Sequence, residues 1–204
     1  MNNRELSIEE IREIAFRTTA QSHSSDWKAH RYGKLTSSKF GRAIYVIRNR
    51  HSTKIQHLRD DIYAPKYLDL IPAIEWGVDH ESLAIDTYQN TSGRIVKPTG
   101  HWMFRINIMG ASPDGLFFTD NHGACAVGIL KVKCQSLVRD VKIECASDWH
   151  HHLTYLDCRN ELKKTHDYYY QIKVAMALVG VDWCDFVIWT RSNMKTQRIR
   201  RDHG

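Results

Sequence analysis

Two acidic residues and one lysine stand out as groups that could do chemistry together. Asp114 lies in a tight turn, Ser112-Pro113-Asp114-Gly115-Leu116, and Lys133 lies in the next strand-like segment, Gly128 to Cys134; Glu81 lies on a predicted helix. Hydrolysis of a phosphodiester needs an activated water, neutralisation of the charge at phosphorus and help for the leaving oxygen. Two divalent cations held by carboxylates can supply all three, and a lysine can orient the water or stabilise the transition state.

Lys131 conflicts with this chemistry. Side chains alternate along a strand, so residues 127, 129, 131 and 133 share one face, and Lys131 lies about 7 Å from Lys133. An ammonium group in the place of an anionic ligand repels a divalent cation and can pair with Asp114 or Glu81 instead. Even at a surface-like dielectric, a charge reversal about 4 Å from such an ion changes its binding by several kcal/mol. The sequence therefore predicts weak metal binding.

The elements that must position these residues follow from apolar periodicity. Ser7 to Glu10 reads as a capping box that opens an N-terminal helix within residues 1–24. A helix from about Ile74 to Gln89 carries Glu81 on the same side as Ala84 and Tyr88. The other predicted elements are a helix ending near Ile47, an exposed connection from Arg48 to Asp61, strands near 94–97, 101–108, 114–118 and 126–134, a helix from about Glu161 to Val179, and a buried strand over 183–190. This order predicts an α/β fold with a central mixed β-sheet flanked by helices.

The bulk properties narrow the class of protein. A chain of 204 residues fits one domain, which we place at residues 1–190, followed by a basic tail over 191–204 that either contacts a phosphate backbone or is solvated. A net charge of +6 is compatible with a polyanionic partner. Five cysteines without a CxxC pair favour a reducing, intracellular setting over a disulfide framework or a zinc site. The absence of a long apolar run predicts no membrane association.

Five segments in a fixed order resemble the YqaJ-type viral recombinase family, a lambda-exonuclease-like group of PD-(D/E)XK nucleases. The similarity covers roughly residues 25 to 190. The matching segments are Trp27 to Ser38 (W-x-x-x-R-x-G-x-x-T-x-S), Trp76 to Glu81, Ser112 to Leu116, Gly128 to Cys134, and Leu162 to Gln171, running on to Trp183-Cys184-Asp185-Phe186. The resemblance implies a restriction-endonuclease-like core.

The resemblance also implies a catalytic role for each matching residue. Asp114 matches the central metal ligand, with the carbonyl of Val132 near the metal. Glu81 matches the helical acid, which binds metal directly or in the second sphere. Lys133 matches the catalytic lysine and Gln171 a glutamine that positions substrate or water. The expected cofactor is Mg²⁺ (or Mn²⁺) in a two-metal site.

A second set of residues falls where relatives bind the terminal 5′-phosphate: Arg31, Thr36, Ser37 and Ser38. Hydroxyl groups beside an arginine at a helix start are also a sound phosphate site on physical grounds. Without the resemblance, simple helix capping by Ser37 and Ser38 is an equal alternative. His166, beside Asp167, is interpreted as a helix cap rather than as half of an acid–base pair.

Three departures from the family pattern decide the expected activity. Lys131 stands in place of the metal-binding glutamate, Lys173 in place of a second glutamine, and Gln135 in place of a proline; Glu144 is the only acid that offers itself as a substitute. The resemblance implies Mg²⁺-dependent 5′-to-3′ digestion of linear double-stranded DNA with 5′-phosphate ends, and Lys131 predicts that this activity is impaired or lost. Alternatives are a non-catalytic DNA-end-binding protein and a structure-specific or single-strand endonuclease. A single-strand annealing recombinase partner and an oligomer are both compatible with the family.

Overall fold

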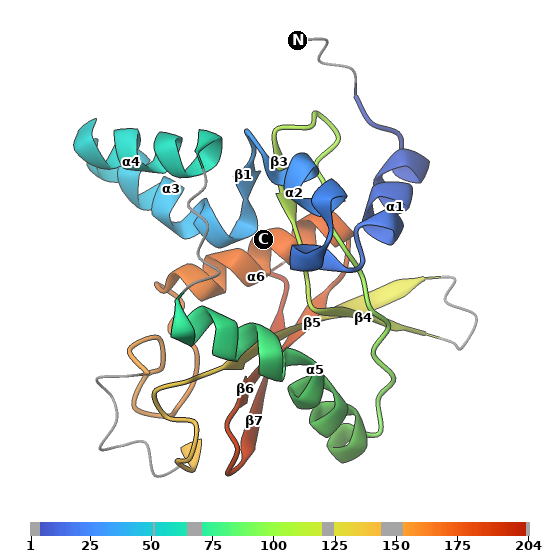
Figure 1. Cartoon of the computed structure of the whole chain (residues 1–204), viewed down its shortest axis with the longest axis vertical. Helices are drawn as coiled ribbons and strands as arrows, with labels where there is room; N and C mark the ends of the chain where they lie inside the picture. Colours follow the sequence, from blue (N-terminus) through green and yellow to red (C-terminus); the bar gives the residue numbers. More distant parts are fainter. Residues whose placement is uncertain (1–4, 51, 65–70, 120–124, 144–152, 203–204) are drawn as a thin grey trace. The chain divides into compact units, whose positions relative to one another are not determined.

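The computed structural model describes residues 5–50, 52–64, 71–119, 125–143 and 153–202, coloured in Figure 1. The chain forms two compact units, each built from three separate stretches. Unit 1 takes its described residues from 1–66, 98–114 and 165–181, and unit 2 from 67–97, 115–164 and 182–204. The single domain expected over residues 1–190 stays a prediction. Glu144 and the histidines at 150–152 lie outside the described residues. Among the described residues, no helix is long and apolar enough to cross a membrane.

Unit 1 begins with the predicted capped helix, α1 (Ile8–Arg17). The Ser7 hydroxyl accepts a hydrogen bond from the Glu10 amide at 3.2 Å, and the Glu10 carboxylate accepts one from the Ser7 amide at 2.8 Å. This reciprocal capping box satisfies two amides that a helix start leaves open. The buried isoleucines of α1 pack against β2 (Trp102–Met103).

Three short strands form a sheet in unit 1 with the order β1-β3-β2. β1 (Leu35–Thr36) runs parallel to β3 (Met109–Ala111), and β2 runs antiparallel to it. At Gly110 a Cβ atom would lie 2.3 Å from Nε2 of His101, so only glycine lets this strand lie directly on the imidazole ring. The segment predicted as one strand over 101–108 contains only β2, followed by the turn that leads into β3.

The helices of unit 1 include one in place of the exposed connection that the sequence predicted. They are η1 (Gln21–His23), α2 (Ser25–Arg31), α3 (Ser37–Asn49), α4 (Ser52–Tyr63) and α6 (Asp167–Val179). The expectation of an irregular connection over 48–61 was wrong, because α4 covers most of it. Residues 53–57 of α4 are all exposed, which explains why no apolar period marked this helix. An ion pair between Arg42 and Asp61 joins α3 to α4.

Helices α3 and α6 approach each other closely in unit 1. A Cβ atom at Gly41 would lie 2.3 Å from Oδ1 of Asp167 and 2.9 Å from its Cα atom, so the contact requires glycine. His166 is the N-cap of α6, and its Nδ1 accepts a hydrogen bond from the Tyr168 amide at 3.1 Å. The capping role predicted for His166 is confirmed, whereas the helix begins later than the predicted Glu161.

Unit 2 contains the central mixed sheet, with the order β4-β5-β6-β7. Its strands are β4 (Gly115–Phe118), β5 (Ala126–Cys134), β6 (Trp183–Trp189) and β7 (Met194–Arg200). β5 pairs antiparallel with β4 and parallel with β6, and β7 closes the sheet antiparallel to β6. Part of the terminal segment expected to be a basic tail is thus a sheet strand. Residues 94–97 form no strand; Lys97 makes a single bridge to Leu116.

Helix α5 (Pro72–Ser92) packs against β5 within unit 2. Ala84 and Tyr88 lie on its inner side and meet Leu130 and Val132 of β5 in one buried cluster. This spacing of four residues is the stripe that the sequence predicted. The Tyr88 hydroxyl donates to the buried Asp185 at 2.5 Å, so the helix is fastened to β6 by a polar bond as well as by apolar packing.

Candidate functional site

The start of α3 in unit 1 is a helix terminus suited to an anion. Thr36 is its N-cap and makes no side-chain capping bond in the described structure. Thr36 and Ser37 are buried, Ser38 is exposed, and the hydroxyls of Thr36 and Ser38 lie 3.0 Å apart. The first turn, Ser37 to Phe40, contains no acidic residue. The capping alternative for the two serines therefore finds no support in this geometry, and the helix dipole favours negative charge at this end.

Arg31 lies close to this helix terminus in sequence and is a partly buried cation. Its guanidinium lies over the Trp27 ring, 4.0 Å from the ring centroid. Burial lowers the pKa of Arg31 to about 10, because removal of water disfavours the charged form. Burial also lowers the pKa values of Lys34 and Lys39; the charge of Asp61 raises the pKa of Lys39 in part, while those of Arg31 and Arg42 lower it further. A bound anion would relieve this accumulation of positive charge.

The turn that carries Asp114 is fixed within unit 1 by side chains from distant segments. The Trp27 indole N–H donates to Oγ of Ser112 at 2.9 Å, and Nδ1 of His101 lies 3.0 Å from the same oxygen. Gln21 donates to the Pro113 carbonyl at 2.8 Å. Asp114 itself is only 5% exposed. The turn is thus a rigid platform for a buried carboxylate.

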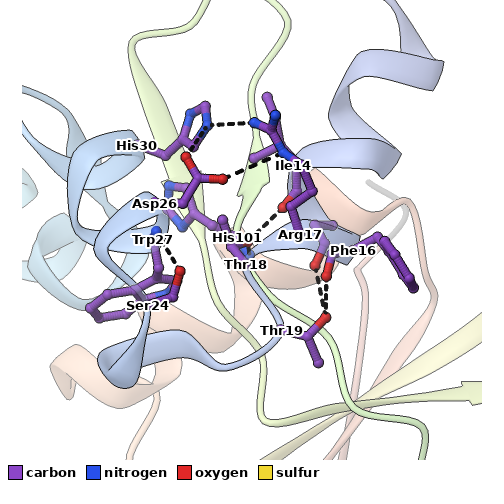
Figure 2. A network of polar contacts seen from close by, with 11 residues as sticks. Ile14, Phe16, Arg17, Thr18, Thr19, Ser24, Asp26, Trp27, His30 and His101 are labelled. Atoms are coloured by element: carbon purple, nitrogen blue, oxygen red, sulfur yellow. Dashed lines mark hydrogen bonds and ion pairs between the residues drawn. The ribbon is translucent and has the colours of Figure 1, made fainter.

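Figure 2 shows how α1 and α2 are tied together: Arg17 lies 3.4 Å from the Asp26 carboxylate and 3.3 Å from Nε2 of His30. The Ser24 hydroxyl accepts a hydrogen bond from the Trp27 amide at 3.2 Å, which caps α2. Thr18, which is fully buried, accepts from the His101 amide at 2.7 Å and donates to the Ile14 carbonyl at 2.6 Å. Burial, and then the charge of Arg31, lower the pKa of His101 to about 3, so its imidazole is neutral at physiological pH.

Four of the predicted site residues belong to unit 2. Lys131 and Lys133 lie on β5, where strand alternation gives them one face and Val132 the other, the side that packs on α5. Both lysines are partly buried, as is Glu81 on α5, which lies one turn before Ala84. β4 pairs with β5 through Gly115 and Leu130, so the strand that begins after the acid turn and the strand that carries the lysines are neighbours in the sheet. Asp114 is the residue immediately before Gly115.

The predicted residues therefore fall into two groups. Unit 1 holds Arg31, Thr36, Ser37, Ser38, Asp114 and Gln171, and unit 2 holds Glu81, Lys131, Val132 and Lys133. The assembly of both groups into one catalytic site stays a prediction. Within the described ranges, no group of three His, Cys, Asp or Glu side chains is placed to hold a metal ion. Lys131, between Leu130 and Val132 on β5, supplies a positive charge and no ligand oxygen.

Sequence reasoning missed the contacts that organise unit 1. The sequence indicated Trp27 only as the first residue of a family segment, whereas its N–H and its ring face both make specific contacts. Ser112 and His101 were not singled out at all. Trp27 and Ser112 do lie in two of the segments that carry the family resemblance, but nothing in their spacing shows that they touch.

Comparisons with known proteins agree with this architecture. A family model described as the YqaJ-like viral recombinase domain matches residues 26–182. Two crystal structures of the alkaline exonuclease LHK-Exo from Laribacter hongkongensis, one in complex with dAMP, each cover 88% of this chain and 83% of that protein, with TM-scores of 0.60 and 0.61 and sequence identities of 24% and 26%.

Two more distant structures share the fold. A phage-related exonuclease from Haemophilus somnus is 15% identical, covers 83% of this chain and 85% of its own, and has a TM-score of 0.54. The SOX protein, solved in a complex with DNA, is 12% identical over 90% of this chain and 59% of its own, with a TM-score of 0.56. No curated protein sequence matches the chain significantly.

Proposed function

Because the chain belongs to the YqaJ-like viral recombinase domain family, we propose that it recognises and digests linear double-stranded DNA from 5′-phosphorylated ends, in the 5′-to-3′ direction. At the level of the family and its structural neighbours it is a lambda-exonuclease-like DNA exonuclease. The observation that best supports end recognition is the partly buried cation Arg31, which lies over the Trp27 ring and is followed in the chain by the N-terminus of α3. A terminal phosphate is the part of a DNA end whose charge and acceptor oxygens suit both features.

Divalent metal is part of the proposal. Mg²⁺ or Mn²⁺, when bound, would supply charge neutralisation and an activated water. Among the residues of this chain, Asp114 and Glu81 would provide carboxylates and Val132 a carbonyl oxygen, while Lys133 would stabilise charge at phosphorus and Gln171 would orient substrate. Asp114 suits a ligand role because it is buried in a turn held by several side chains.

Lys131 decides how far catalysis proceeds in this chain. Lys131 lies between Leu130 and Val132 on β5, the strand that pairs with β4, and β4 follows the acid turn directly. Its positive charge therefore opposes metal at the proposed site. The chain as it stands is therefore proposed to bind DNA ends with impaired or absent cleavage. The same substitution favours the alternative function, a DNA-end-binding protein without catalysis. A recombinase partner, an oligomer and an intracellular location belong to the proposal at the level of the family.

The proposal is tested by restoring the glutamate. The variants are K131E, K131Q, which removes the charge without adding a ligand, and K142E, a matched charge reversal at an exposed residue of unit 2. End-labelled duplex with a 5′-phosphate or a 5′-hydroxyl, and closed circular DNA, are incubated with Mg²⁺. We expect K131E to digest 5′-phosphorylated linear DNA at least about a hundred-fold faster than the native chain, since several kcal/mol of metal binding are restored.

The outcomes separate the candidate functions. Faster cleavage by K131E but not by K142E supports the exonuclease. Retention of DNA ends by every variant, with no cleavage even in K131E, supports the end-binding protein. Cleavage of closed circles would contradict an exonuclease and indicate an endonuclease on the same scaffold.

A further inference from the structure

Trp27 contacts two parts of unit 1 that are far apart in the sequence. Its ring carries the Arg31 guanidinium 4.0 Å above the centroid, and its indole N–H donates to Oγ of Ser112 at 2.9 Å. Ser112 opens the turn that ends at Asp114. One side chain therefore touches both the Arg31 guanidinium and the turn with the buried Asp114 carboxylate.

The Ser112 hydroxyl has a defined set of partners. An indole N–H can only donate, so Oγ of Ser112 is the acceptor of the Trp27 bond. Its own proton is then available to Nδ1 of His101, 3.0 Å away, which is an acceptor in the tautomer protonated at Nε2. Loss of the indole donor would leave the hydroxyl free to turn and would remove the hydrogen bond that directs the ring of residue 27 toward this turn.

The ring of Trp27 also restrains Arg31. A guanidinium stacked on an aromatic face lies parallel to the ring, so its N–H groups point sideways, where an anion can reach them. Rotation of the ring would carry the guanidinium with it. The N–H of Trp27 thus fixes the ring, and the ring fixes the arginine.

We propose that Trp27 is a positioning residue for DNA-end recognition, whose indole N–H couples the orientation of Arg31 to the turn from Ser112 to Asp114. The inference rests on the proposed function, since it takes Arg31 to be the group that meets a 5′-phosphate. It adds that the preference for 5′-phosphate over 5′-hydroxyl ends depends on a hydrogen bond made entirely within the protein.

The test compares two Trp-to-Phe substitutions. W27F keeps an aromatic ring under Arg31 and removes only the donor. W102F is the matched control, because the Trp102 indole N–H also donates at 2.9 Å within unit 1, but to Thr99. Dissociation constants for duplex DNA with 5′-phosphate or 5′-hydroxyl ends are measured in EDTA. We expect W27F to lower the phosphate preference by about three- to ten-fold, the effect of one hydrogen bond, and W102F to leave it unchanged.

S112A provides an independent route that also covers a W27F variant that fails to fold. It removes the acceptor of the same bond, so W27F and S112A combined should lower the phosphate preference no further than either change alone. Additive losses would show that the two residues act separately and would overturn the inference, as would an unchanged preference in W27F or an equal loss in W102F.

The inference and the proposed function fail in different ways. A native chain that binds both kinds of end equally contradicts the proposed phosphate recognition itself. A native chain with a clear preference that W27F retains contradicts the role of Trp27 alone.

Discussion

Replacement of Arg31 by methionine should make the protein more stable and less selective at the same time. Burial lowers the pKa of Arg31 from its ordinary value to about 10, and at ~1.4 kcal/mol per pKa unit this corresponds to about 3 kcal/mol of unfavourable charge burial. The stacking on Trp27 offsets ~1 kcal/mol of it. R31M keeps an unbranched apolar chain on the ring and removes the charge, so the free energy of unfolding should rise by about 2 kcal/mol.

Thermal unfolding measures the change in stability, and DNA binding measures the change in selectivity. For a chain of this length, ~2 kcal/mol corresponds to a rise in Tm of about 4 to 8 °C. Inorganic phosphate, compared with chloride at equal ionic strength, should raise the Tm of the native chain through binding near Arg31 and should not raise that of R31M. DNA ends with a 5′-phosphate should lose their advantage over 5′-hydroxyl ends in the variant.

The control is R105M, which removes an arginine that is 63% exposed and pairs with Glu5 at 3.1 Å. Surface pairs of this kind contribute ~0–1 kcal/mol, so R105M should neither stabilise the protein nor change its response to phosphate. If R31M unfolds at a lower temperature than the native chain, and phosphate has no effect on either, Arg31 is a structural cation and the phosphate site is refuted.

Three further substitutions test the framework of the two units. Burial lowers the pKa of His101 to about 3, below its unfolded value of about 6.5. Its contribution to stability is therefore complete above pH 6.5 and falls by ~1.4 kcal/mol per pH unit toward pH 3. In urea unfolding, H101Q should reduce by about 2 kcal/mol the loss of unfolding free energy between pH 7 and pH 5. R198Q should cost about 3 kcal/mol in the same assay, because it removes two 2.7 Å bonds from the buried Asp185. G41A should cost about 1 to 3 kcal/mol, since its Cβ would press on Asp167.

Each of these has a matched control in the chain. H57Q changes an exposed histidine of α4 and should leave the pH dependence unaltered. K195Q removes a single bond from the same strand as Arg198, at 3.1 Å to the Arg159 carbonyl, and should change stability by less than about 1 kcal/mol. G77A places its Cβ 3.9 Å from its nearest neighbour and should be neutral or slightly stabilising, because alanine favours a helix. Equal effects in variant and control would contradict the assigned contacts.

The sequence predicted those elements whose signals are local. The capping box at Ser7 predicted where α1 begins, and the stripe of Ala84 and Tyr88 predicted the inner face of α5. Both signals depend on residues three or four apart. α4 was missed because most of its side chains face solvent and leave no apolar period. β7 was missed because its ladder with β6 and the bond from Arg198 to Asp185 join distant residues.

The sequence predicted which residues belong to the candidate site but not how their side chains contact one another. The residue types at 31, 36–38, 114 and 133 follow from motifs, and β4 pairs with β5 as the order of the acid turn and the lysine strand required. The links between motifs could not be read from spacing, since Trp27 and Ser112 are 85 positions apart. A hydrogen bond of that range depends on the whole path of the chain between its ends.

The interleaved course of the chain through its two units has a consequence for biosynthesis. Unit 1 is complete only when residues 165–181 are present, and unit 2 only when 182–204 are present. A ribosome that has released the first 164 residues has therefore delivered neither unit in full: α3 still lacks α6, and β5 still lacks its parallel neighbour β6. An open strand edge of this kind invites aggregation, so prematurely terminated products should need chaperones or be degraded, and the protein should not tolerate being split into separately expressed halves.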